Sequence, residues 1–297
     1  MARRRAAALV VATVSVAATV ASGCGGHGGS GDPSRTPATP ARIEGDVSVA
    51  RLTYSASDGG RLPAVLVTPR GFSPRGCLIW QNGLNERKED PAEIWHRAAR
   101  LGLAVLTVDL PGDGIGAGAP GDIAAVDPRH LAALIDGWVS DLGRAVADLE
   151  GRPECRRNIG YVGLGLGGMI GSLLAGRDPR IHATVIVSTP PTWRSLIAVG
   201  DPTAGVEQLR TADRVLAPLD PVSWIPRISP QPAMVLIGRD DPLVPPAEAA
   251  RLVAAAPTPK RIVHYRGTDP FSAADDTGAA FQVETFLLRW LVKPTYV

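Results

Sequence analysis

The chain has 297 residues, of which 45% are hydrophobic and 20% are charged, and its formal net charge is +2 at pH 7. This length and composition suit one large α/β domain of about 250 residues or two smaller domains. The sequence contains no block of like charges, which argues against a nucleic-acid-binding site.

Residues 1–23 have the pattern of a signal peptide. Residues 3–5 are arginines, residues 6–20 are apolar, and residues 21–23 are small. The apolar run is short for a transmembrane helix. Residues 21–24 resemble the lipobox of bacterial lipoproteins, which implies that Cys24 is the lipidated first residue of a protein anchored in the cell envelope, on the outer face of the cytoplasmic membrane. An ordinary secretory signal peptide is the alternative, and a twin-arginine signal is a weaker one.

Residues 24–44 are rich in glycine, serine and proline and predict a flexible tether. Cleavage of the signal peptide removes three arginines and changes the formal net charge from +2 to −1. His27 lies in this tether without a second metal ligand nearby. Cys77 and Cys155 are expected at the same end of neighbouring strands. We expect them to be buried free thiols, with a disulfide as the alternative in an exported protein.

Residues 45–297 predict one domain with a mostly parallel sheet and helices on both faces. Strands at 47–54 and 62–68 are predicted to form an antiparallel hairpin. Further apolar strands are predicted at 77–81, 103–109, 159–163, 184–188, 233–238 and 261–265. Apolar residues at helical spacing predict helices over 91–101, 128–149, 246–255 and 279–291. The proline-rich segment 189–230 interrupts this alternation and predicts a small cap.

Residues 158–172 give the most informative pattern in the chain. An apolar strand is followed by the glycine-rich run Gly163–Gly168 and then by a helix start. This is the arrangement of a nucleophile elbow, G-x-S-x-G, in which a serine stands at the turn between strand and helix. Here the glycines that permit the turn are present, but Gly165 occupies the serine position.

Four motifs between residues 45 and 292 resemble those of α/β-hydrolases of the dienelactone-hydrolase and acyl-peptidase kind. They are QNGL at 81–84, DLPGDG at 109–114, GLGLGG at 163–168 and GRDDPLVP at 238–245. The resemblance implies an α/β-hydrolase fold with a triad in the chain order serine, acid, histidine. It also implies an oxyanion hole built from the backbone N–H groups of Leu84 and Leu166.

Two of the three triad positions lack the expected residue. Asp241 fits the acid position, although it could instead cap the following helix, and Asp240 is expected to be a solvated loop charge. The loop after the last strand, where the histidine should stand, contains none. Asp269 is the best match to the histidine position, with Thr268 and Pro270 as alternatives because the register of this loop is uncertain.

No other residue clearly replaces the missing pair. His264 lies inside a predicted strand, and Ser188 and Ser195 have no histidine near them in the sequence, so each lacks a base. The remaining histidines are expected on surface helices or at the far end of the sheet: His96, His130 and His182. The resemblance and the two losses favour a pseudoenzyme that binds a small apolar or acyl ligand, or a protein partner, through the old active-site cleft. The alternative is an active serine esterase or peptidase with a displaced site.

Metal and nucleotide sites are less consistent with the sequence. The five histidines have no metal-binding spacing such as H-E-x-x-H, so neither a metal nor another cofactor is expected. Gly163–Gly168 also matches the dinucleotide fingerprint G-x-G-x-x-G, which makes nucleotide binding a third hypothesis. It lies far from the first βαβ unit, however, and Ser188 rather than an acidic residue ends the next strand.

Overall fold

The computed structural model describes residues 35–36, 41–84, 93–109, 120–156, 158–267, 270–271 and 277–292. All of them belong to the compact unit Gly31–Val297. The predicted signal peptide and Cys24 therefore lie outside the described residues, as do Thr268 and Asp269. No helix within the described ranges combines the length and the apolar character needed to cross a membrane.

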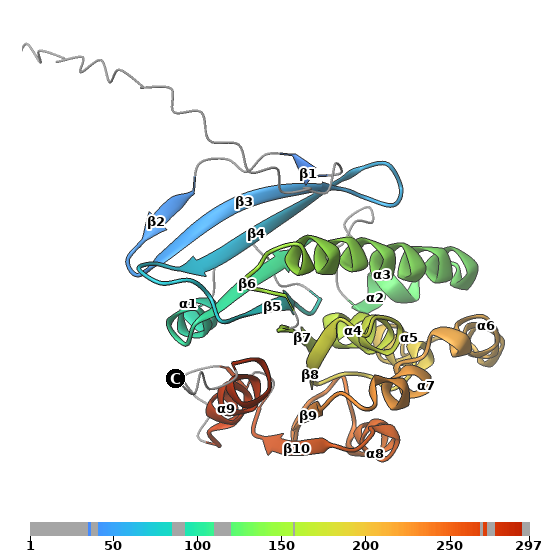
Figure 1. The fold of residues 1–297 in the computed structure, drawn as a ribbon. Helices are drawn as coiled ribbons and strands as arrows, with labels where there is room; N and C mark the ends of the chain where they lie inside the picture. Colours follow the sequence, from blue (N-terminus) through green and yellow to red (C-terminus); the bar gives the residue numbers. More distant parts are fainter. Residues whose placement is uncertain are drawn as a thin grey trace, which may run out of the picture. The chain divides into compact units, whose positions relative to one another are not determined.

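Within the described residues, ten strands form a single sheet (Figure 1), in the order β1-β3-β4-β6-β5-β7-β8-β9-β10, with β2 paired to β3. The hairpin β3–β4 is antiparallel, β4 is antiparallel to β6, and the pairs from β6 to β10 are parallel. The mostly parallel sheet predicted from the sequence is confirmed. The strands are β1 (Arg35–Thr36), β2 (Arg42–Glu44), β3 (Val47–Ser55), β4 (Arg61–Pro69), β5 (Gly76–Gln81), β6 (Leu103–Val108), β7 (Ile159–Leu164), β8 (Ile181–Val187), β9 (Ala233–Gly238) and β10 (Lys260–Tyr265).

Helices cover both faces of this sheet (Figure 1). On one face α1 (Glu93–Arg100) and α9 (Ala279–Leu291) enclose an apolar core with the central strands. On the other face α3 (Pro128–Glu150), α4 (Leu166–Arg177) and α8 (Pro246–Ala255) contribute to a second core. The remaining helical elements are α2 (Pro120–Ala124), α5 (Trp193–Gly200), α6 (Val206–Leu216), η2 (Ala217–Leu219), α7 (Pro221–Trp224) and η3 (Ile225–Ile228). The last five lie within the predicted cap segment, residues 189–230.

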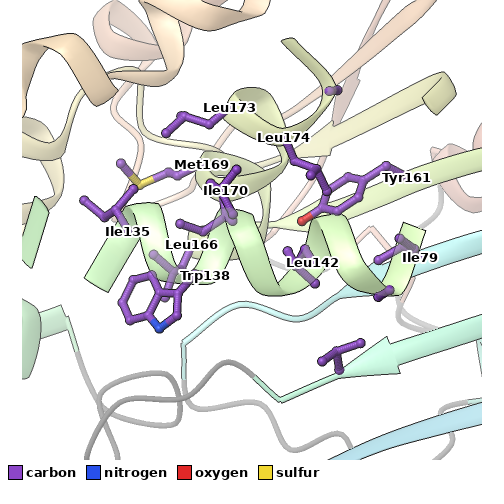
Figure 2. Packing of buried hydrophobic residues seen from close by; sticks show 14 of the residues in the cluster. Ile79, Ile135, Trp138, Leu142, Tyr161, Leu166, Met169, Ile170, Leu173 and Leu174 are labelled. Carbon is purple, nitrogen blue, oxygen red and sulfur yellow. The ribbon is translucent and has the colours of Figure 1, made fainter. Parts of the chain in front are cut away.

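The long helix α3 shows how the sequence determines the local structure. Asp127 is the N-cap, and its Oδ1 accepts hydrogen bonds from the backbone N–H groups of Arg129 and His130 at 2.9 and 3.2 Å. Pro128 opens the helix, where its missing N–H leaves no bond unmade. Most of the apolar residues at helical spacing are buried, and Figure 2 shows Ile135, Trp138 and Leu142 packed against α4.

Cys77 and Cys155 form a disulfide, so the expectation of free thiols is wrong. Cys77 lies in β5, and Cys155 precedes β7, the strand that pairs with β5. The pairing brings the two Cα atoms to 5.2 Å, within the range that a disulfide bridges. The two cysteines are 78 residues apart in the chain. Sequence alone could place them at one end of the sheet, but it could not give this distance.

Candidate functional site

The turn between β7 and α4 is a sharp corner at Gly165. Gly165 has φ 49° and ψ −112°, a conformation that residues with a Cβ rarely adopt. Its N–H donates to the carbonyl of Val187 at 2.9 Å, and its carbonyl accepts the first intrahelical bond of α4, from Met169 N–H at 3.0 Å. The predicted strand–turn–helix corner is therefore present, with Gly165 at its apex and Leu166 as the first residue of α4.

The glycines on either side of Gly165 are fixed by close backbone contacts. A Cβ added to Gly163 would lie 2.5 Å from the carbonyl oxygen of Gly167. One added to Gly167 would lie 2.3 Å from the carbonyl oxygen of Gln81. At Gly165, by contrast, the nearest atom would be 3.8 Å away, on Gly83. The apex therefore has room for a side chain, whereas its neighbours have none.

Tyr161 packs against this corner and forms a hydrogen bond with it. Its hydroxyl donates to the carbonyl oxygen of Gly167 at 2.6 Å, and its ring occupies the space where a Cβ on Gly171 would lie. Figure 2 shows Tyr161 pointing toward α4 among the buried apolar side chains. Complete burial raises the pKa of the Tyr161 hydroxyl well above its usual value, so it remains a neutral donor.

A cavity of about 130 Å³ opens beside the corner. It brings together four of the predicted site residues: Leu84, Gly165, Leu166 and Asp241. Most of its wall is apolar and comes from Leu84, Leu164, Leu166, Val187, Pro190, Leu196, Pro242 and Leu243. Pro190 and Leu196 belong to the cap segment, so that segment borders the cavity. We call this space the elbow cavity.

Asp241 supplies the carboxylate of the elbow cavity. Only 8% of the residue is exposed, and its Oδ1 accepts a hydrogen bond from Leu243 N–H at 2.8 Å. It does not cap α8, because that helix begins at Pro246 with Pro245 as its N-cap and without a side-chain cap. The neighbouring Asp240 is exposed, as expected.

A protein-family model for the dienelactone hydrolase family matches residues 62–269, which is more than half of the chain and includes β7, α4 and the Asp241 loop. The chain belongs to the dienelactone hydrolase family. The α/β-hydrolase fold implied by the sequence resemblance is therefore confirmed.

One relative and two solved structures are similar to this chain at low sequence identity. The 2,6-dihydropseudooxynicotine hydrolase of Paenarthrobacter nicotinovorans is 28% identical over 130 residues, which cover 43% of this chain and 32% of that protein. This chain therefore matches about a third of the length of that relative. An acetyl xylan esterase from Paenibacillus sp. R4 has a TM-score of 0.67 at 19% identity, covering 86% of this chain and 89% of its own. Acetyl xylan esterase 1 from Thermoanaerobacterium sp. has a TM-score of 0.68 at 17% identity, covering 87% and 88%. These two likenesses show the fold alone.

Ser188 lies in the wall of the elbow cavity in an unusual backbone conformation. Its φ is 44°, and Ser188 is the one non-glycine residue with positive φ in the described part of the chain. Its N–H donates to Leu236 O at 3.0 Å, and its Oγ forms a hydrogen bond with the hydroxyl of the fully buried Tyr265. The sequence identified Ser188 as a candidate but missed Tyr265. A hydroxyl-bearing residue at the buried end of the last strand was the available signal.

The other candidate nucleophile and the described histidines lie away from the elbow cavity. Ser195 Oγ donates to Glu248 Oε2 at 2.6 Å, and Ser195 is not among the described residues that line the cavity. His264 lies on β10 and lines a separate groove of about 290 Å³ beside α8, together with Arg239. His96, His130 and His182 are likewise not among the described lining residues.

The histidine position of the family's triad falls in a loop that the structure describes only in part. Asp269 and Thr268 lie outside the described residues, and Pro270 is buried. The sequence shows that this loop contains no histidine, because no histidine follows His264. Within the described residues no group of three or more side chains of the kinds that bind metals comes together.

Proposed function

We propose that this protein is a non-hydrolytic member of the dienelactone hydrolase family that binds a small ligand in the elbow cavity. One observation carries the proposal: Gly165 occupies the apex of an otherwise complete nucleophile elbow. Acyl transfer on this fold needs a nucleophilic hydroxyl and a base that removes its proton. A glycine supplies no hydroxyl, and the chain has no histidine after β10 to act as the base.

The residues around Gly165 keep the geometry of the site, which supports a binding function. Gly163 and Gly167 keep the close backbone contacts that the corner requires, and Asp241 remains at the cavity wall. The walls are mainly apolar with few polar groups, which is the composition of a small-molecule pocket. A cavity with this lining favours a ligand with an apolar body.

A second candidate is an esterase or peptidase with a displaced site, and Ser188 is the observation that favours it. Its backbone conformation is rare for serine, and such conformations often occur at functional sites. Its Oγ is bonded to the hydroxyl of Tyr265, however, and a neutral phenol is a weak base at neutral pH. This leaves the Ser188 hydroxyl without an effective activator.

A fluorophosphonate probe and p-nitrophenyl acetate distinguish these two candidates. The unmodified protein should neither be labelled nor hydrolyse the ester, and Gly165→Ser alone should remain inactive for want of a base. Gly165→Ser combined with Asp269→His should give measurable hydrolysis, because triad members act as a unit. Histidine at Thr268 or Pro270 covers the uncertain register.

The controls for this experiment are Ser188→Ala and Ser195→Ala. Labelling of the unmodified protein that disappears in Ser188→Ala would refute the non-hydrolytic function and establish the displaced site. If no folded double variant reacts with the probe, the cavity has diverged beyond hydrolase geometry. In that case the binding function would stand, but restoring the two side chains would not be enough to restore hydrolysis.

We also propose that the protein is exported and lipid-anchored through Cys24 in the bacterial cell envelope. The Cys77–Cys155 disulfide supports an oxidising compartment, where such bonds persist. The N-terminal pattern supports the anchor itself. Cys24→Ala should leave the precursor uncleaved by lipoprotein signal peptidase and without lipid label. Normal labelling of this variant by a fatty-acid analogue would contradict the anchor.

A further inference from the structure

The described wall of the elbow cavity holds one ionisable side chain, and that side chain is an acid. Among the described residues that line the cavity, Asp241 is the one ionisable side chain. In a complete triad the acid orients a histidine, whose imidazole gains positive charge during the reaction. The chain has no histidine after His264, so this carboxylate has lost the partner that its position serves.

The hydrogen bonds of Asp241 leave part of the carboxylate open to a ligand. Oδ1 accepts from Leu243 N–H at 2.8 Å. Within the described residues, no lysine, arginine or histidine forms an ion pair with Asp241. A carboxylate that is 8% exposed and has no cationic partner among the described residues is suited to be the counter-ion of a cationic ligand.

Ser188 adds a second acceptor on the same cavity. Its carbonyl oxygen lies 4.0 Å from the point that a Cβ on Gly165 would occupy, so it faces the space left by the absent serine. A primary ammonium donates three hydrogen bonds and accepts none, which suits a carboxylate and a carbonyl together. The other described lining residues have mostly apolar side chains, and the volume of about 130 Å³ is close to that of cavities that hold one small ring.

We infer that the elbow cavity binds a small apolar amine as its ammonium ion, with Asp241 as the counter-ion. This rests on the proposed function, since a working triad would use Asp241 for catalysis. The ligand is a primary amine that carries one ring or a short branched aliphatic group. Its ammonium lies at Asp241 and the Ser188 carbonyl, and its apolar part lies against Leu84, Leu166 and Leu196.

The nearest rival ligand is a carboxylate of the same size. The cavity also borders Leu166 at the N-terminus of α4, where the helix dipole attracts anions. This dipole is equivalent to about half a positive charge. The side-chain oxygens of Asp241 in the same cavity suit an ammonium donor and oppose a carboxylate, so the cation is favoured.

Calorimetric titration with three molecules that share a cyclohexyl ring and differ in the polar group tests the inference. Cyclohexylammonium, cyclohexanol and cyclohexanecarboxylate are titrated into the folded protein without its predicted signal peptide, at neutral pH and low salt. Charge-assisted hydrogen bonds should make the ammonium bind roughly tenfold to a hundredfold more tightly than the alcohol, with the carboxylate weakest. Equal or tighter binding of the alcohol or the carboxylate, or no saturable binding of the amine, would overturn the inference.

Two matched variants locate the site. Asp241→Asn keeps an acceptor for Leu243 N–H but removes the charge, and it should bring the amine to the affinity of the alcohol. Asp240→Asn makes the same change at the exposed neighbouring residue and should retain the full preference. If Asp241→Asn does not fold, the ranking of the three molecules on the unmodified protein still decides the question.

The outcomes separate this inference from the proposed function. Hydrolysis of an acetyl ester by the unmodified protein would refute the non-hydrolytic function, whatever the amine does. A cavity that binds cyclohexanol best without hydrolysis would overturn the inference and leave the non-hydrolytic binding function intact. An amine preference that persists unchanged in a folded Asp241→Asn protein would overturn the assignment of Asp241.

Discussion

The elbow (residues 163–168) and the cap segment border the same cavity, but different interactions fix their shapes. The elbow depends on backbone atoms in direct contact at Gly163 and Gly167, and its supporting Tyr161 stays neutral. The cap segment is packed through apolar side chains, and it adds buried polar contacts at the start of α5. There Asp220 Oδ1 accepts from Trp193 N–H, and the Trp193 indole N–H donates to Leu219 O, both at 2.8 Å.

This difference separates a rigid wall of the cavity from one that responds to its surroundings. The close backbone contacts at the glycines leave the elbow no second conformation of similar free energy. Its conformation should therefore change little with pH or ligand. The polar contacts of the cap segment include the buried carboxyl group of Asp220. Burial raises its pKa to about 7, so its charge changes with pH near neutrality. The predictions below test this contrast.

The largest effect should come from the disulfide that joins β5 to the chain before β7. Replacing both cysteines, Cys77→Ser with Cys155→Ser, should lower the free energy of unfolding by about 4 kcal/mol, because the bond closes a long loop in the unfolded chain. Urea unfolding under oxidising conditions measures this change. A loss below about 1 kcal/mol would show that the two strands are held without the bond.

The next effect should come from the elbow contacts. Gly167→Ala places a Cβ 2.3 Å from Gln81 O, so backbone must move, and we expect a loss of roughly 3 kcal/mol or no folded protein. Gly143→Ala is the control, since its Cβ meets no atom within 4 Å. Gly143 lies in the middle of α3, where alanine should stabilise by about 0.5–1 kcal/mol. Equal stabilities of the two variants in urea would mean that close packing does not fix the elbow.

The same contrast explains which features the sequence could predict. The positions of the central strands, the capped start of α3 and the corner at Gly165 follow from local signals: apolar runs, Asp127-Pro128 and clustered glycines. The sequence misses β1 and β2, which are two and three residues long and too short to show alternation.

The parts of the site that the sequence could not give depend on distances between remote elements. The disulfide joins residues 78 apart, and the bond between Ser188 and Tyr265 joins β10 to the residue that follows β8. Spacing within one segment carries no signal for such pairs. Asp241 illustrates the intermediate case, because its motif places it at the cavity but does not show that its carboxylate lacks a cationic partner.

A smaller effect is expected at the apex of the elbow. Gly165→Ala adds a methyl group where the nearest atom is 3.8 Å away, so packing should not oppose it. The backbone conformation should, because a Cβ is unfavourable at φ 49° and ψ −112°. We expect a loss of about 1–3 kcal/mol, smaller than at Gly167 and measured by the same urea titration. A melting temperature at or above that of the parent protein would show that the apex is not strained for residues with a Cβ.

The smallest effect should come from Asp220 and should depend on pH. The unfolded chain releases this proton near pH 4, whereas in the folded protein burial raises the pKa to about 7. The contribution of Asp220 to stability should therefore be greatest below about pH 4, fall as pH rises toward 7, and stay level above it. The shift sets an upper bound of about 4 kcal/mol. Asp220→Asn keeps an acceptor for Trp193 N–H but is itself polar and buried, so it should recover a fraction, on the order of 1 kcal/mol at pH 8.

Urea unfolding of the parent protein and Asp220→Asn at pH 5 and pH 8 measures this effect. The gain of the variant should grow between the two pH values, because only the parent loses its proton in that range. Asp240→Asn removes an exposed carboxylate and should show no such pH dependence. If the gain is the same at both pH values, Asp220 does not titrate in this range, and the cap segment is as insensitive to pH as the elbow.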